Sequence, residues 1–224
     1  MKRNVSLEEI SDGRLYGPND MVKADCHGCK GCSDCCQGMG GSIILDPYDV
    51  YRLTTGLGKS LQELLQREVE LNVVDGVILP NLKMDGPTER CAFLDPAGRC
   101  SIHAYRLGIC RLFPLGRYYE NGAFKYFLQK SECPAAHSKV KVSKWIDTPQ
   151  LPMNTAFVTK WHYMMNEAEE LVKSAEDEAF GKNLNMFILN TFYLAPYDGS
   201  RDFYEQFEER CRRYREIVPD QEAL

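Results

Sequence analysis

Five cysteines within eleven residues constrain this chain more than any other feature of its sequence. They form three consecutive C-x2-C steps that end in an adjacent pair: Cys26, Cys29, Cys32, Cys35 and Cys36. Cysteines so close along the chain rarely reach disulfide geometry with one another. Glycines separate many of them, so the segment cannot bury an apolar face and needs a bound group to fix its shape. The pattern therefore predicts that these thiols bind metal.

The adjacent pair Cys35 and Cys36 bears on the number of metal ions. Consecutive side chains point in different directions, so both thiols act as ligands only if they face two ions or different corners of one cluster. Soft thiolates prefer zinc, copper(I) or iron–sulfur clusters. The pair favours at least two ions or one polynuclear cluster over a single zinc ion. The spacing excludes the radical-SAM signature C-x3-C-x2-C, and Gln37 stands where the bacterial ferredoxin run requires proline.

Composition limits the class of protein. The 224 residues are 44% hydrophobic, which is enough for one buried domain with a smaller appendage. The net charge of −5 argues against a protein that coats nucleic acid. No apolar run is long enough to predict a membrane-spanning helix, and the N-terminus lacks the apolar core of a secretory signal. We therefore expect a cytoplasmic protein whose reduced thiols are ligands and not disulfides.

The sequence divides into three regions. Residues 1–24 are expected to be an N-terminal leader with one short helix. Residues 25–140 are expected to form a cysteine-cluster metal-binding domain. Residues 141–224 are expected to be a C-terminal helical region packed on that domain. The fold class that follows is α+β, a small irregular Cys-rich core with short β-hairpins packed by helices, followed by the helical region.

Capping residues and turn pairs predict individual elements. Ser6 and Ser60 are placed to begin helices, because each is followed three residues later by glutamate, and Asp46 is placed to begin another, because Pro47 follows it at the first helical position. Asp-Gly at residue 75, Asp-Pro-Ala-Gly at 95–98 and Asn-Gly at 121 predict three hairpins. Helical periodicity covers residues 155–178, 184–194 and 203–218. Cys211 lies in the last of these, and we expect it to be a surface or interface cysteine.

The cysteines further along the chain lie in motifs of their own. C-A-F-L and G-R-C-S-I-H supply Cys91, Cys100 and His103, and Y-R-L-G-I-C-R-L-F-P supplies Cys110. A Cys-Pro step follows at Cys133. Together with C-K-G-C-S-D-C-C, these motifs resemble the YkgJ-like cysteine-cluster family, the CxxCxxCC group described as zinc- or iron-chelating. The resemblance runs from Cys29 to Cys133, and it departs from the family pattern at Leu107 and at the additional Cys26.

The resemblance implies a ligand set while leaving zinc and iron both open. Arg106 and Arg111 flank Cys110, and we expect them to bind the cofactor by offsetting the charge of a polythiolate site. Whether Cys26 or His103 is a ligand stays open. The expected metal ligands are Cys29, Cys32, Cys35, Cys36, Cys91, Cys100, Cys110 and Cys133.

Three functions follow from this pattern. The first is an iron–sulfur cluster used for electron transfer or to support a partner enzyme. The second is a structural zinc site that folds an interaction module. The third is a protein N-methyltransferase, because some members of the family are similar to flagellin lysine N-methylases. No nucleotide-binding or acyl-transfer motif identifies catalytic residues. A protein partner is expected, whereas nucleic-acid binding and membrane insertion are not.

Overall fold

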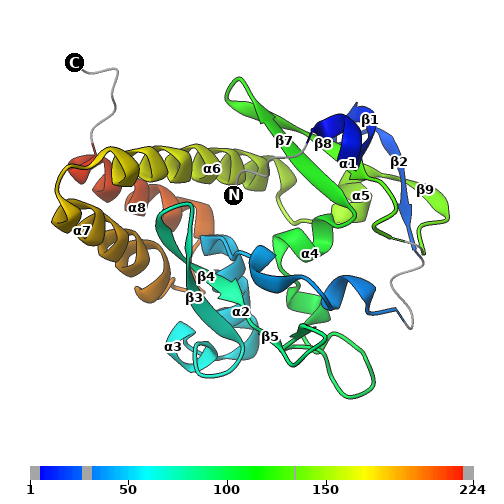
Figure 1. Cartoon of the computed structure of the whole chain (residues 1–224), viewed down its shortest axis with the longest axis horizontal. Coiled ribbons are helices and arrows are strands. Elements are labelled where there is room, and N and C mark those ends of the chain that lie inside the picture. Colours follow the sequence, from blue (N-terminus) through cyan, green and yellow to red (C-terminus); the bar gives the residue numbers. More distant parts are fainter. Residues whose placement is uncertain (1–5, 27–31, 134, 219–224) are drawn as a thin grey trace.

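The computed structural model describes residues 6–26, 32–133 and 135–218 (Figure 1). These residues form α-helices and small antiparallel sheets, which confirms the expected α+β class. Figure 1 shows the long helices gathered on one side of the molecule and most of the small sheets on the other. Within the described residues, no helix is both long and apolar enough to cross a membrane.

The N-terminal segment is built into two of the sheets. Helix α1 (Leu7–Ile10) begins at Ser6, whose hydroxyl and the Glu9 carboxylate cap each other's backbone N–H groups. Strand β1 (Ser11–Tyr16) then pairs antiparallel with β8 (Ala123–Gln129). Strand β2 (Met21–Asp25) pairs antiparallel with β9 (Ser138–Lys141). The segment expected as a leader therefore lies against the C-terminal end of the cysteine-rich region.

A three-stranded sheet carries the smaller of two hydrophobic cores. Strands β7 (Leu115–Glu120) and β8 (Ala123–Gln129) form the hairpin predicted at Asn-Gly, and the sheet order is β1-β8-β7. Helix α5 (Val142–Ile146) packs beside it. The core contains Tyr16, Val22, Ala24, Leu112, Leu115, Tyr126, Val142 and Ile146.

The elements before this sheet confirm three further predictions. Helix α2 (Pro47–Leu57) is capped by Asp46 and ends at Gly58, whose φ of 63° suits glycine. Helix α3 (Leu61–Leu64) is capped by Ser60. Strands β3 (Val69–Val74) and β4 (Val77–Leu82) form the hairpin predicted at Asp-Gly. The hairpin predicted at residues 95–98 is reduced to a single bridge between Leu94 and Cys100.

The helical region forms most of the larger core. Helix α6 (Leu151–Ser174) begins before the expected position because proline is tolerated in a first helical turn. Helix α7 (Glu178–Leu189) continues into the π-helical turn η5 (Asn190–Leu194), and α8 (Phe203–Ile217) packs against η5 and α6. An aromatic cluster that includes Phe157, Trp161, Phe192 and Phe207 fills the space between them.

Helix α8 corrects the expectation for Cys211. Its side chain is buried at 3% exposure and its sulfur lies 3.7 Å from the sulfur of Met164, so it belongs to the core and not to the surface. The neighbouring Arg210 is also buried, and its guanidinium donates to the carbonyls of Thr191, Ala195 and Pro196. The burial of these two residues was not evident from the charged sequence around them, because they face inward on an otherwise polar helix.

The cysteine-rich segments lie where the two cores meet. Helix α4 (Gly108–Leu112) joins them, because Leu107 at its start belongs to the larger core and Leu112 at its end belongs to the smaller one. Around it stand the 3-10 helices η2 (Asp34–Cys36), η3 (Gly40–Ser42) and η4 (His103–Tyr105), with the short strands β5 (Met84–Asp85) and β6 (Arg90–Cys91).

Candidate metal centre

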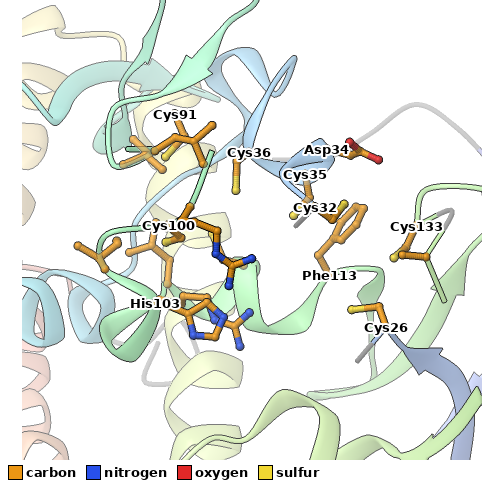
Figure 2. A pocket seen from close by; sticks show the side chains of 18 of the residues that line it. Cys26, Cys32, Asp34, Cys35, Cys36, Cys91, Cys100, His103, Phe113 and Cys133 are labelled. Atoms are coloured by element: carbon orange, nitrogen blue, oxygen red, sulfur yellow. The ribbon is translucent and has the colours of Figure 1, made fainter. Parts of the chain in front are cut away.

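Eight cysteines line one cavity (Figure 2). They come from six segments that are separate along the chain, and no disulfide joins the nine cysteines that the structure describes. Cys211, in the helical core, is the ninth. Cys29 was predicted as a ligand and lies outside the described residues. The cysteines that line the cavity are Cys26, Cys32, Cys35, Cys36, Cys91, Cys100, Cys110 and Cys133.

Short backbone bridges bring the first group of cysteines together. Gln37 forms an antiparallel bridge with Arg90, which places the preceding Cys36 near the following Cys91. Leu94 forms a second bridge with Cys100, and this returns the chain to the cavity. Single bridges therefore hold the irregular loops of this region. In a regular hairpin, successive side chains would point to opposite faces.

The structure places both members of the pair Cys35 and Cys36 on the cavity. Both residues lie in η2 and both line the cavity. Figure 2 shows the Cys36 side chain directed into the open space between Cys91 and Cys100 on one side and Cys35 on the other. A tight 3-10 turn therefore presents two adjacent thiols to one cavity from different directions.

Five thiols of the cavity have a raised pKa when no cation is bound. A hydrogen bond with the Cys36 thiol, followed by burial, raises the pKa of Cys35 above its ordinary value. Burial is the first cause of the raised pKa of the thiols of Cys91, Cys100, Cys110 and Cys133. Binding of a metal ion would require these thiols to lose their protons.

Arg106 is the cation placed to offset thiolate charge. It lines the cavity, and its positive charge lowers the pKa of Cys35 and of Cys100 against the effect of burial. Its Nε atom is buried and has no hydrogen-bond partner among the described residues. A donor left in this state fits a site whose acceptor is a metal-bound sulfur.

The structure places Arg111 and His103 differently. Arg111 was expected beside the cofactor, but its side chain lies outside the cavity lining and its guanidinium donates to the Asp147 carbonyl at 3.1 Å. His103 lines the cavity from η4, and burial together with Arg106 and Arg99 lowers its pKa. Arg99 also lines the cavity, although no sequence motif indicates a role for it.

The residues present fit a thiolate-bound metal in type and in number. The cavity has a volume of about 80 Å³. A cavity of roughly 10–15 Å³ already holds one water molecule, so this one has room for a larger group. Among the described side chains, no three histidine, cysteine, aspartate or glutamate residues already stand close enough to share one ion. The sulfurs therefore surround the cavity without converging on one point, and ligation would draw them inward.

A hydrogen bond to helix α2 holds the start of helix α4 in place. The Asp49 carboxylate of α2 accepts a hydrogen bond of 2.7 Å from the Gly108 backbone N–H, at the start of the helix that carries Cys110. Helix α2 also lies close to η4, because a Cβ on Gly56 would stand 2.4 Å from the Tyr105 ring. The sequence does not indicate this contact of Asp49, because an acidic residue at this position of a helix is already explained by its role as a cap.

Comparison with known families gives one match. Residues 28–134 match the sequence model of the family CxxCxxCC, described as a "putative zinc- or iron-chelating domain". No curated protein and no solved structure matches the chain. The match covers seven of the eight cysteines of the cavity and supports metal binding by this region. Cys26 lies outside the matched residues.

Proposed function

We propose, on the premise that residues 28–134 match the CxxCxxCC family, that the chain holds an iron–sulfur cluster used for electron transfer or to support a partner enzyme. The residues that would hold it belong to the cavity cysteines within the family match and to Cys29. When bound, such a cluster supplies one-electron redox chemistry.

The number of thiols on one cavity is the observation that carries the proposal. A structural zinc ion takes four ligands in a tetrahedron, whereas eight described cysteines line this cavity. Cys35 and Cys36 both belong to that lining, although they are adjacent in sequence. Sulfur donors in this number and arrangement suit a polynuclear cluster better than one isolated ion.

The position of the cavity supports electron exchange with a partner. Cys26 and Cys91 are buried, while Cys32, Cys35, Cys36, Cys100, Cys110 and Cys133 are only half-buried. A cluster on these sulfurs would lie near the surface, where a second redox centre can approach. Solvent exposure and nearby charge also set cluster potentials, so Arg106 would adjust the potential of a cluster at this position.

Apolar side chains of the chain limit the access of water to the sulfurs. Leu107, Phe113 and Trp145 line the cavity between the thiols. The Trp145 indole N–H donates to the Phe113 carbonyl at 3.1 Å, which fixes both aromatic residues at the end of α4. These contacts orient the cluster-binding segments from the side of the smaller core.

Anaerobic metal analysis tests the proposal. Full-length protein is purified without oxygen from cells grown with both metals, and its iron, zinc and acid-labile sulfide are counted per chain. We expect iron and sulfide in equal amounts, with a broad absorbance of thiolate-to-iron charge transfer that bleaches on reduction. Protein that carries zinc alone, and that stays colourless after anaerobic reconstitution with iron and sulfide, would contradict the iron–sulfur assignment.

A structural zinc site is the second candidate. Its support is the all-sulfur donor set, which suits tetrahedral zinc, and the irregular backbone around the cavity, where segments are joined by single bridges. In that case the metal would fold an interaction module and have no redox role. The same analysis selects this candidate if zinc is stoichiometric and the loaded protein accepts no electrons from dithionite.

A further inference from the structure

We propose that Cys26 is a metal ligand and that, with Cys32 and Cys133, it forms a second metal-binding lobe of the cavity. The ligand would be a soft transition-metal ion, bound separately from the ion or cluster on the remaining cysteines. This inference rests on the proposed metal binding and extends it to a cysteine that the family match does not include.

The pairing of β2 with β9 places Cys26 beside Cys133. Asp25, the last residue of β2, pairs with Ser138, the first residue of β9. The Ser138 hydroxyl donates to the Asp25 carboxylate at 2.9 Å, and the His137 N–H donates to the Asp25 carbonyl at 2.9 Å. Because the strands are antiparallel, the chain leaves β2 and enters β9 at the same end of the sheet.

Two observations show that this end of the sheet opens on the cavity. Cys26 is 7% exposed and both it and Cys133 belong to the cavity lining. The Cys133 thiol has electrostatic contact with the thiols of Cys26, Cys32 and Cys35. A sheet outside the family match thus carries one additional sulfur into a site that the matched residues build.

The cavity is extended, with its thiols at two ends. Figure 2 shows Cys36, Cys91 and Cys100 towards one side and Cys26 and Cys133 towards the other, with the Phe113 ring among them. Cys110 has its sulfur neighbours in the first group, since its thiol has electrostatic contact with Cys91, Cys35 and Cys100. Cys35 has contact with members of both groups and would stand between the lobes.

Thiol chemistry identifies the ligand of this second lobe. Three sulfurs describe a site for a soft ion such as iron or zinc, and not for calcium or magnesium, which prefer oxygen. The charge of Arg106 lowers the pKa of Cys35 and Cys100, in the part of the cavity that faces Cys91 and Cys110. A second ion would offset the charge of the thiolates of Cys26, Cys32 and Cys133.

Cobalt(II) titration tests the second lobe without regard to which metal the protein holds in cells. Reduced, metal-free, full-length protein is titrated anaerobically with Co²⁺, and thiolate-to-cobalt absorbance and bound cobalt are measured. Wild-type protein should bind about two ions per chain, since each tetrahedral ion takes about four ligands. Cys26→Ser and Cys133→Ser should each lose one ion, and the double variant should lose no more than either alone.

Two further variants make the result specific. Cys91→Ser should remove the other ion, so that its combination with Cys26→Ser abolishes the thiolate-to-cobalt absorbance. Cys211→Ser changes a buried cysteine outside the cavity, where a serine hydroxyl can bond to the preceding helical turn, and it should bind cobalt as the wild type does. Circular dichroism of each metal-free variant establishes that the helical region is folded.

The possible failures are distinguishable. Folded Cys26→Ser protein with the wild-type cobalt count and absorbance would overturn the second lobe while leaving the proposed metal binding intact. Additive losses in the double variant of Cys26 and Cys133 would also overturn it, because the two residues would then serve different ions. Wild-type protein that binds no cobalt through thiolates would overturn both proposals.

Discussion

The Asp49 carboxylate accepts a hydrogen bond of 2.7 Å from the backbone N–H of Gly108, which joins helix α2 to the helix that carries Cys110. The same carboxylate caps the start of α2 by accepting from the Asp46 N–H. Asp49 is 3% exposed, so water cannot replace it as an acceptor for Gly108. One buried side chain therefore fixes both the capping of α2 and the position of a cysteine of the cavity.

Replacing Asp49 should destabilise the protein more than replacing an ordinary cap. Asp49→Ala leaves the Gly108 N–H buried and unpaired and should cost roughly 2–3 kcal/mol of unfolding free energy. Glu63 occupies the same capping position in α3 but is exposed, and Glu63→Ala should cost only about 0.5–1 kcal/mol. Urea unfolding of metal-free protein measures both, and equal losses would contradict the linking role of Asp49.

The raised thiol pKa values predict how stability depends on pH without metal. Burial raises the pKa of Cys91, Cys100 and Cys110 above the ordinary thiol value of 9.0. As pH rises past 9.0, the unfolded chain releases protons that the folded chain retains. The unfolding free energy should therefore fall, by roughly 1.4 kcal/mol per pH unit for each such proton.

Metal loading should reverse the sign of this dependence. Metal-bound thiols have already lost their protons, so unfolding of the loaded protein takes protons up below pH 9.0. Over the range below pH 9.0, the stability of loaded protein should therefore rise with pH relative to the stability of metal-free protein. Urea unfolding across a pH series checks both forms, and parallel pH profiles would refute ligation by these buried thiols.

The elements that the sequence predicted correctly are those with local signals. Asp46 and Ser60 cap helices because their side chains reach the N–H three residues ahead, and the Asp-Gly and Asn-Gly pairs provide the positive φ of tight hairpins. These signals need no knowledge of distant residues. The composition of the metal cavity was predictable for a related reason. Many thiols in a short glycine-rich segment have few structural roles other than metal binding.

The pairings between distant residues were not predictable. Nothing in residues 21–25 indicates that they pair with residues 138–141, and this pairing is what brings Cys26 into the cavity. Arg106 lies four residues before Cys110 and Arg111 one residue after it, yet Arg106 lines the cavity and the Arg111 guanidinium donates to the Asp147 carbonyl. Sequence spacing fixes neither the direction of a side chain nor its partner across the fold.

Removing the metal should unfold the cysteine-rich loops before the helices. The aromatic core between α6, α7 and α8, with Trp161 and Phe207, contains no cavity cysteine. The loops around the cavity depend on single bridges such as that of Leu94 with Cys100. Chelation should therefore leave the helical circular dichroism largely intact while amide exchange quickens at residues 32–42 and 84–104, as measured by hydrogen exchange. Simultaneous loss of both signals would show that the metal supports the whole fold.

Arg210 should be intolerant of lysine. Its guanidinium donates to three carbonyls within and directly after η5 and lies 3.4 Å over the Tyr197 ring. Lysine offers neither the planar fork nor the stacking surface, so Arg210→Lys should cost roughly 1–3 kcal/mol by leaving buried carbonyls unpaired. Arg213 is exposed on the same helix, and Arg213→Lys should stay within about 0.5 kcal/mol of wild type. Thermal unfolding of metal-loaded protein compares the two variants.

Removing the charge of Arg106 should lower the reduction potential of the loaded protein. A nearby cation stabilises the reduced cluster, which carries one more negative charge, and Arg106 has charge contact with Cys35 and Cys100. Losing about 1 kcal/mol of that interaction in Arg106→Gln would shift a one-electron potential by roughly 40 mV towards negative values. Arg106→Lys keeps the charge and should retain most of the wild-type potential.

Exposed Arg213 provides the matched control, because it lies on α8 outside the cavity lining and Arg213→Gln removes the same charge there. Redox titration followed by absorbance should give the wild-type potential for this variant, since charges separated by more than about 8–10 Å through water are largely screened. If Arg106→Gln and Arg213→Gln shift the potential equally, only net charge matters and Arg106 has no specific position beside the cluster. If Arg106→Gln changes the iron content and not the potential, Arg106 supports assembly of the site and does not adjust its electronics.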